Sequence, residues 1–326
     1  MHDFIVYIEN SLEETSPYFI SEEAVRNALG DNATNARIHC CSKSNPDIEA
    51  LSTAHYFVGS GFDTQRIGRV ATSVRIVHCT SAGVEKYMPM DWLPKGAVLT
   101  NSSGVHAEKG GAFGLMTVLM LLEGIPRHIR NQRNHFWDNQ LSKGVSKQTV
   151  VFVGFGALGR AIGARLKALR TTIVSVTRSG RSDDISDKTF PVSRLAEVLP
   201  LADCLVISCP LTPETKGLIG RNEIQLLKRG ATLFNIGRGA VLDEMALSRA
   251  LENGHLSGAA LDVFENEPLS ADSGLWDVPN LLIFPHISCD EVEGYVDRCL
   301  DLFAANILRD QLGLSLHNRV DASLGY

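Results

Sequence analysis

Short apolar runs alternate with helical stretches along the whole chain. In the first third, strand-like runs lie at 4–8, 36–40, 55–58 and 75–79, with helical spacing of apolar residues at 22–29. A second, longer series of strands is expected at 149–153, 172–176, 204–208, 231–235, 258–262 and 281–284. Strands that alternate with helices in this way predict an α/β fold, with helices on both faces of parallel sheets.

The segment between the two series, AEKGGAFGLMTVLMLLEGIPRHI, carries more apolar side chains than a simple surface helix would. We expect a helix at 108–124 whose surplus apolar area is buried against a second subunit, which predicts a homodimer. A central core helix of a monomer is the alternative. A final helix is expected at 290–308, followed by a short tail.

Composition and charge narrow the class of protein. The 326 residues are 44% hydrophobic and 21% charged, as in globular proteins, and are enough for two domains. No apolar run approaches the length of about 20 residues that a membrane-spanning helix needs. The first residues, MHDFIVYIEN, lack a basic start and a cleavage site, so we expect no signal peptide. A net charge of −6 without a long basic block disfavours nucleic-acid binding.

The cysteines indicate the compartment. There are seven, none of them in a C-x-x-C pair, and most lie in apolar runs such as ADCLVISCP. Buried reduced thiols in a cytoplasmic protein are the favoured interpretation, with disulfides or a metal site as alternatives. We expect no metal.

A glycine-rich stretch follows the first strand of the second series. In VVFVGFGALGRAIGARL, Gly154, Gly156 and Gly159 have the G-x-G-x-x-G spacing between a strand and an amphipathic helix. This is typical of a dinucleotide-binding turn, in which the backbone approaches a pyrophosphate at a helix N-terminus. A glycine-rich turn without a ligand is the alternative.

The end of the next strand indicates which dinucleotide binds. An acidic residue there would bind the ribose hydroxyls of NAD and repel a 2′-phosphate. The chain has Thr177 instead, followed by Arg178, Ser179 and Arg181. Because a guanidinium pairs with phosphate through two hydrogen bonds, we expect NADP(H) to be favoured and leave NAD(H) open. The alternative is that Arg178 and Arg181 are solvated loop cations.

Polar side chains follow three later strands. Arg238 lies in FNIGRGAVLDE, Asp262 and Glu267 in AALDVFENEPL, and His286 in FPHISCD. Ligands of open α/β sheets bind beyond the carboxyl ends of the strands, so these residues are expected to converge. His286 can protonate a carbonyl oxygen, while Glu267 orients the ring and stabilises its charged form. Arg238 suits a carboxylate and can polarise a ketone. Each residue alone has a structural alternative as a strand-end or capping side chain.

Together these motifs resemble the D-isomer-specific 2-hydroxyacid dehydrogenases. The resemblance runs from about residue 75 to residue 308 and rests on VGFGALG, CPLTPETKGLI, NIGRGAVLDEMAL, AALDVFENEP and FPHIS. It implies that Arg238, Glu267 and His286 are the catalytic residues.

The resemblance also implies which residues bind the cofactor and the substrate. The backbone of Cys209, Pro210 and Leu211 would line the adenine pocket, with Ile236 and Gly237 under the nicotinamide ring and Asp262 near its carboxamide. The expected cofactor-binding set is Gly154, Gly156, Ala157, Leu158, Gly159, Thr177, Arg178, Ser179, Arg181, Cys209, Pro210, Thr215, Ile236, Gly237, Arg238, Asp262, His286 and Ser288. The expected substrate-binding set is Ser81, Ala82 and Gly83, as the cradle for the substrate carboxylate, with Arg238 and His286.

The implied architecture is a Rossmann-type doubly wound cofactor domain at 101–286. It is inserted into a smaller flavodoxin-like substrate domain made of 1–100 and 287–326. Family members are typically dimers. The family usually carries a glutamate at the position of Ala112, and this departure bears on the contacts of the long helix rather than on the chemistry.

The expected function is reduction of a small 2-oxo acid to the D-2-hydroxy acid with NADP(H), in the cytoplasm. Glyoxylate, hydroxypyruvate and branched or aromatic 2-oxo acids all stay open. A phosphoglycerate dehydrogenase-like enzyme is one alternative, although we expect no regulatory extension of the kind that many of those carry. A non-catalytic, dinucleotide-sensing corepressor-like protein is another. Candidate walls of the side-chain pocket are Tyr87, Met88, Trp92 and Trp137, each of which is equally a core or dimer contact.

Overall fold

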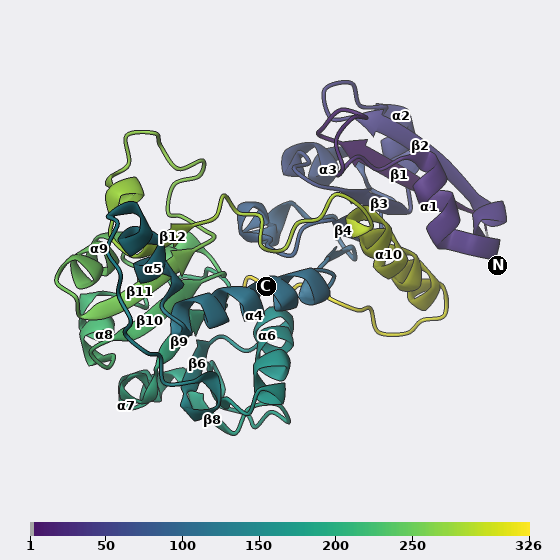
Figure 1. Ribbon diagram of the computed structural model, residues 1–326. Coiled ribbons are helices and arrows are strands. Elements are labelled where there is room, and N and C mark those ends of the chain that lie inside the picture. Colours follow the sequence, from purple (N-terminus) through teal and green to yellow (C-terminus); the bar gives the residue numbers. More distant parts are fainter. Residues whose placement is uncertain (1–2) are drawn as a thin grey trace. The chain divides into compact units, whose positions relative to one another are not determined.

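The computed structural model describes residues 3–326 and divides into two compact units. Unit 1 consists of the residues up to Val105 together with Glu291–Tyr326, and unit 2 is His106–Asp290. The boundaries expected from the sequence, at 100 and 287, lie within about five residues of these positions. Each unit is built on one parallel sheet (Figure 1).

Unit 1 has five strands in the order β2-β1-β3-β4-β5, all parallel. This is the order of flavodoxin-like folds. The strands are β1 (Phe4–Asn10), β2 (Ala36–Ser42), β3 (Tyr56–Gly59), β4 (Ile76–Cys79) and β5 (Val98–Asn101). The helices are α1 (Glu22–Leu29), α2 (Ile48–Thr53), α3 (Thr64–Val70) and α10 (Tyr295–Gln311).

The side-chain alternation of β1 explains how the helices of unit 1 cover its sheet. Val6 and Ile8 belong to one core cluster with residues of α1 and α10. Tyr7 faces the opposite cluster, which α2 and α3 complete. The C-terminal helix α10 therefore packs beside α1 on a sheet that begins at the N-terminus (Figure 1).

Unit 2 has seven parallel strands in the order β12-β11-β10-β9-β6-β7-β8. The strands are β6 (Thr149–Val153), β7 (Thr172–Thr177), β8 (Lys188–Pro191), β9 (Cys204–Ile207), β10 (Ala231–Asn235), β11 (Leu256–Leu261) and β12 (Leu281–Ile283). The helices are α4 (Ala107–Leu122), α5 (Ile125–Arg133), α6 (Ala157–Ala168), α7 (Leu195–Val198), α8 (Arg221–Leu226) and α9 (Glu244–Glu252). The order in which successive strands are added to the sheet reverses between β6 and β9. Doubly wound sheets bind ligands at such a switch point.

The expected strands are present, and the structure adds two that the sequence pattern did not reveal. These are β5 and β8, each only four residues long, and β8 ends in a proline at a sheet edge. The expected final helix is wrong at its start, because α10 begins at Tyr295 rather than at residue 290. Gly294 precedes it with φ +81°, a left-handed conformation that an α-helix cannot include.

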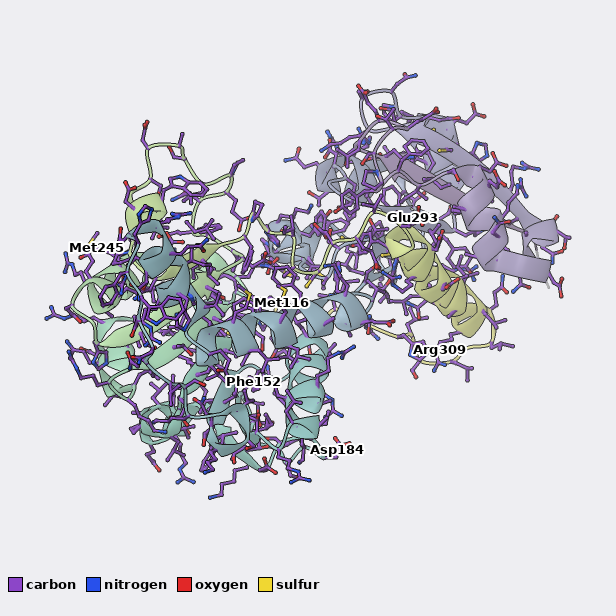
Figure 2. The ribbon with its side chains drawn as sticks, viewed as in Figure 1. Met116, Phe152, Asp184, Met245, Glu293 and Arg309 are labelled. Carbon is purple, nitrogen blue, oxygen red and sulfur yellow. The ribbon has the colours of Figure 1, made fainter. Side chains whose placement is uncertain are left out.

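The long apolar helix differs from the expectation in a similar way. It ends at Leu122, and a 63° bend separates it from α5. Its buried face is rich in glycine and packs on α6: a Cβ at Gly114 would lie 2.4 Å from Ile162 Cδ1. Ala112 is exposed. Met116, which Figure 2 labels on the same helix, is also exposed.

Two further findings concern the described residues only. No single helix among them is long and apolar enough to cross a membrane, although the bent pair α4–α5 meets the length and composition criteria together. No group of three or more potential metal-ligating side chains converges within residues 3–326.

Candidate active site

The glycine turn joins β6 to α6. Gly154 has φ +86°, and a Cβ there would lie 2.5 Å from the backbone nitrogen of Cys209, so only glycine fits. At Gly156 the Cβ direction is open, with no atom within 4 Å. The first N–H groups of a helix lack partners within the helix, so those of Ala157, Leu158 and Gly159 are available to an anion beside Gly156. The turn therefore fits a pyrophosphate.

No carboxylate occupies the end of β7. The hydroxyl of Thr177 accepts a hydrogen bond from Gly180 N–H at 3.0 Å, which turns the chain sharply there. The side chains of Arg178, Ser179 and Arg181 are exposed. The nearest acids in sequence, Asp183 and Asp184, are held elsewhere by ion pairs with Arg160 of α6.

The loop after β9 lies against the turn. Cys209 is buried between Gly154 and Gly237, since a Cβ at Gly237 would lie 2.7 Å from its carbonyl oxygen. The hydroxyl of Thr215 donates to the carbonyl of Pro210 at 2.7 Å and so closes this loop. Burial raises the pKa of the Cys209 thiol to about 11, so the thiol is neutral at physiological pH.

Arg238 follows β10 on a turn that is held by a residue outside the expected site, Asn235. Asn235 holds this turn by accepting a hydrogen bond from Gly237 N–H and donating to the carbonyl of Arg238, both at 3.1 Å. The guanidinium of Arg238 also donates to the carbonyl of Gly237 at 2.7 Å. Asn235 is fully buried. A polar residue at the end of a buried strand, as in NIGRG, is the sequence feature that could have indicated this role.

The Arg238 turn packs directly on the loop after β11. A Cβ at Gly239 would lie 1.9 Å from the backbone carbon of Phe264. Real Cβ contacts are never this close, so the two loops touch at a position that only glycine allows. Glu267 belongs to the second loop, and its Oε1 accepts a hydrogen bond from Phe264 N–H at 2.9 Å.

Glu267 and His286 are brought together as expected. Oε2 of Glu267 lies 2.7 Å from Nδ1 of His286, while Oε1 is held by the backbone. Both side chains are partly exposed, so the pair is accessible from solvent. His286 has φ +55°, a left-handed conformation that is uncommon for a residue with a side chain.

Asp262 holds the two residues that follow His286. Its carboxylate is 1% exposed and accepts hydrogen bonds from the N–H groups of Ile287 and Ser288 and from the Ser288 hydroxyl. Burial raises the pKa of Asp262, against the effect of these donors. The contact joins the end of β11 to the loop after β12.

The expected cofactor-binding and catalytic residues of unit 2 thus follow the carboxyl ends of β6, β7, β9, β10, β11 and β12. In a parallel sheet these ends form one edge, so the structure gathers them on one side of unit 2. Ile236, at the end of β10, is buried beneath this edge.

Ser81, Ala82 and Gly83 follow β4 at the corresponding edge of unit 1. Their loop is held by its carbonyls, since Ser81 accepts from Ser102 N–H at 3.1 Å and Ala82 from the Asn101 side chain at 2.8 Å. Within the described residues, the N–H groups of Ala82 and Gly83 have no acceptor. Consecutive unpaired N–H groups form a concave site that suits an anion.

The four candidate pocket walls separate into two groups. Tyr87 is buried, and Met88 and Trp92 pack against the same cluster of unit 1, so these three are core residues. Trp137 in unit 2 is 93% exposed.

Comparison with known proteins identifies the chain at family level. Residues 115–288 match the family model of the D-isomer specific 2-hydroxyacid dehydrogenase NAD binding domain. A glyoxylate/hydroxypyruvate reductase A (HPR2) of Arabidopsis thaliana is 31% identical over 260 residues, covering 79% of this chain and 81% of that protein.

Two solved structures resemble the whole chain. A D-isomer specific 2-hydroxyacid dehydrogenase from Xanthobacter autotrophicus, in complex with NADPH and MES, has a TM-score of 0.86, 26% identity and full coverage of both chains. An NADPH-dependent glyoxylate/hydroxypyruvate reductase from Sinorhizobium meliloti, in complex with NADP and sulfate, has a TM-score of 0.82 and 26% identity, covering 99% of this chain and 100% of that one. The chain belongs to the D-isomer-specific 2-hydroxyacid dehydrogenases, oxidoreductases that use a nicotinamide dinucleotide to interconvert 2-oxo and 2-hydroxy acids.

Proposed function

We propose that this protein is an NADP(H)-preferring reductase that converts a 2-oxo acid to the D-2-hydroxy acid. The observation that carries the proposal is the 2.7 Å contact between Glu267 and His286. It lies at the sheet edge that also presents Arg238 and the glycine turn. A proton donor, a cation for the substrate and a phosphate-binding turn are the parts that such a reduction requires.

The protein supplies the proton and the orientation. Nδ1 of His286 is engaged by Glu267, so Nε2 is the nitrogen that holds the proton for the carbonyl oxygen of the substrate. Glu267 is fixed through its other oxygen and stabilises the ring when it is charged. Arg238 binds the carboxylate and polarises the ketone, which draws electron density from the carbon that is reduced. The bound dinucleotide supplies the hydride.

Unit 1 by itself offers a site for a carboxylate, at the loop after β4. There the free N–H groups of Ala82 and Gly83 bind the carboxylate of the acid, and the Ser81 hydroxyl flanks them. Backbone donors suit this role because their positions are fixed before the substrate binds.

The preference for NADP(H) is supported by the end of β7. Thr177 places no negative charge there, and the exposed side chains of Arg178 and Arg181 lie in the same loop. Both structures compared above contain NADPH or NADP. A 2′-phosphate that meets two guanidinium groups forms charge-assisted hydrogen bonds.

A homodimer through α4, in the cytoplasm, completes the proposal. Exposed apolar side chains lie on α4 and on the segment after α5: Met116, Phe136, Trp137 and Leu141. Burial of these side chains against a second copy of the chain would remove them from water. All seven cysteines are free thiols, which suits a reducing compartment. Light scattering on the purified chain measures the oligomeric state directly.

The decisive experiment replaces the proton donor. We expect His286→Ala to abolish reduction of glyoxylate and hydroxypyruvate by NADPH, while NADPH still binds as measured by its fluorescence. His317→Ala, a histidine of unit 1 outside the proposed site, is the matched control and keeps full activity. Full activity of His286→Ala would reject the catalytic assignment. Tight NADPH binding by the unaltered protein without turnover of any acid would support a sensor instead.

A further inference from the structure

A cavity of about 210 Å³ lies at the carboxyl edge of the unit 1 sheet, beside the proposed carboxylate cradle. It is formed by loops that follow β1, β3 and β4, together with the start of α10. Ser81 belongs both to the cradle and to the cavity wall, and its hydroxyl lies 3.0 Å from that of Ser60, which also lines the cavity. An acid whose carboxylate is bound at Ala82 and Gly83 therefore has this cavity next to it.

One wall of the cavity is apolar, and the rest of the lining is polar: Glu9, Asn10, Ser11, Ser60, Thr80 and Ser81. Four side chains make the apolar wall: Leu12, Tyr18, Ile20 and Tyr295. The rings of Tyr18 and Tyr295 meet edge to face, with centroids 5.5 Å apart and planes at 81°. Asn10 fixes Ile20 by bonding to both its N–H and its carbonyl at 2.9 Å. Tyr18, Ile20 and Tyr295 are thus held in place before any substrate arrives, whereas Leu12 is exposed.

The volume of the cavity exceeds what the smallest 2-oxo acids can fill. An apolar cavity of about 150 Å³ is large enough to hold benzene. The hydrogen of glyoxylate and the hydroxymethyl group of hydroxypyruvate would leave most of this space to water. An isobutyl or benzyl side chain would fill it and cover the apolar wall.

Among the described residues, the lining of the cavity offers no cation to a second anionic group. No lysine, arginine or histidine of the described chain lines it. The one ionisable lining carboxylate, Glu9, is buried and paired with Arg66 at 2.6 Å, and its other oxygen has no hydrogen-bond partner. The loop that contributes Leu12 continues with exposed Glu13 and Glu14. A distal carboxylate or phosphate would meet no cation among the described lining residues. Of the neighbouring cations, Arg66 is paired with Glu9, and Nζ of Lys43 donates to the carbonyl of Gly61.

We propose that this cavity binds the side chain of the substrate and selects 2-oxo acids whose side chain is uncharged, largely apolar and of isobutyl to benzyl size. This rests on the proposed function, because it takes the 81–83 loop as the carboxylate cradle. It also separates the protein from enzymes that act on phosphorylated 2-oxo acids.

Steady-state kinetics with NADPH tests the selection. The acids are 4-methyl-2-oxopentanoate, phenylpyruvate, glyoxylate and 2-oxoglutarate. We expect kcat/KM for the two apolar acids to exceed that for glyoxylate and for 2-oxoglutarate by roughly tenfold or more, since one methylene group in a fitted pocket is worth about that much. Equal or higher kcat/KM for glyoxylate or 2-oxoglutarate would overturn the inference and leave the proposed reductase standing. Absence of turnover with every acid would overturn both.

Two substitutions of Leu12 test whether this cavity is the surface that selects the substrate. Leu12→Ala is expected to lower the ratio of kcat/KM for phenylpyruvate to that for glyoxylate by about threefold to tenfold, through lost apolar contact. Leu12→Lys is expected to raise the ratio for 2-oxoglutarate to phenylpyruvate. The control is Leu312→Ala, an exposed leucine of unit 1 away from the cavity, which leaves both ratios unchanged. Unaltered ratios in both Leu12 variants would place the selecting surface elsewhere.

Discussion

The Ser288 hydroxyl donates a hydrogen bond to Oδ2 of Asp262, and the Ser288 N–H donates to Oδ1 of the same buried carboxylate at 3.1 Å. Asp262 follows β11, whereas Ser288 lies two residues beyond His286 in the loop after β12. The contact therefore ties the loop that carries the proposed proton donor to the neighbouring strand. It also explains how His286 holds its left-handed φ of +55°.

We predict that Ser288→Ala lowers kcat by about tenfold, because a hydrogen bond to a charged group is worth about 1.5–3 kcal/mol and the loop loses part of that restraint. KM for the acid should change less than kcat, since the groups that bind its carboxylate are untouched. Ser52→Ala, which removes a hydroxyl from α2, is the control. An unchanged kcat in Ser288→Ala would show that the N–H donors alone hold the loop.

Glu267→Gln tests the charge of the catalytic pair while keeping its shape. The amide can still accept from Phe264 N–H, so the loop should keep its conformation. Next to Nδ1 of His286, however, the substituted group carries no negative charge. We expect kcat at neutral pH to fall by about 100-fold, within the range for general acid–base catalysis, with NADPH affinity retained. Titration of NADPH fluorescence and initial rates measure the two quantities, and a loss below threefold would contradict the pairing.

Much of the fold could be predicted because most of its strands are buried along nearly their whole length. A strand such as Thr149–Val153 is a continuous apolar run that follows polar residues and ends at a glycine, so its ends can be recognised in the sequence. Lys188–Pro191 escaped detection because it is an edge strand with polar and half-buried residues. The start of α10 was missed because DEVEG has ordinary helix-forming residues, and only the left-handed Gly294 excludes them from the helix.

In the candidate site, residues within motifs could be predicted from the sequence, whereas residues placed by tertiary packing could not. Motif spacing indicated Glu267 and His286, whose hydrogen bond the structure contains. The burial of Asn235 behind the Arg238 turn depends on the packing of β10 between β9 and β11, which spacing does not reveal. Likewise, Trp92 could not be assigned to the core of unit 1 before its contact with Phe62 was known.

Substitution of the two arginines in the loop after β7 tests whether the protein prefers NADPH to NADH. We predict that Arg178→Ala combined with Arg181→Ala raises KM for NADPH by about 100-fold or more, since each charge-assisted contact to phosphate is worth about 1.5–3 kcal/mol and the double variant loses two. KM for NADH should stay within about twofold of its original value by the same reasoning, because NADH has no 2′-phosphate. Lys188→Ala, an exposed cation on β8, is the matched control. An equal rise in KM for NADPH and NADH would mean that the arginines contact a part of the dinucleotide other than the 2′-phosphate.

Two glycines of unit 2 should respond oppositely to alanine. At Gly156 the Cβ direction is open and the backbone has φ −81°, so Gly156→Ala should keep thermal stability. Its methyl group would occupy the place of a pyrophosphate, so NADPH binding should weaken by tenfold or more, roughly the effect of 1.4 kcal/mol. At Gly239 a Cβ would overlap the Phe264 backbone, so Gly239→Ala should lower the melting temperature by several degrees. Thermal melts and NADPH titrations of both variants measure the two effects. Similar behaviour of the two variants would contradict the assignment of Gly156 to pyrophosphate binding and of Gly239 to loop packing.

His78 should make unit 1 sensitive to acid. It is fully buried beside Phe303, with Nδ1 2.8 Å from the Thr100 hydroxyl, and burial lowers its pKa to about 3. The folded protein keeps this imidazole neutral, whereas the unfolded chain takes up a proton below pH 6.5. The stabilising contribution is therefore complete above pH 6.5 and declines as the pH falls towards 3. By linkage, the free energy of unfolding should decrease by about 2 kcal/mol between pH 7 and pH 5 through this residue.

The comparison with His78→Gln isolates that contribution, because glutamine can bond to Thr100 and Ser102 but takes up no proton. Urea unfolding of both proteins at pH 7 and pH 5 measures it. The variant is expected to be the less stable protein at pH 7, since glutamine fills the ring site imperfectly. The difference from the unaltered protein should then shrink by about 2 kcal/mol at pH 5, since the histidine penalty arises only there. A constant difference at the two pH values would mean that His78 is protonated in the folded state, and that the core around Phe303 admits the charge.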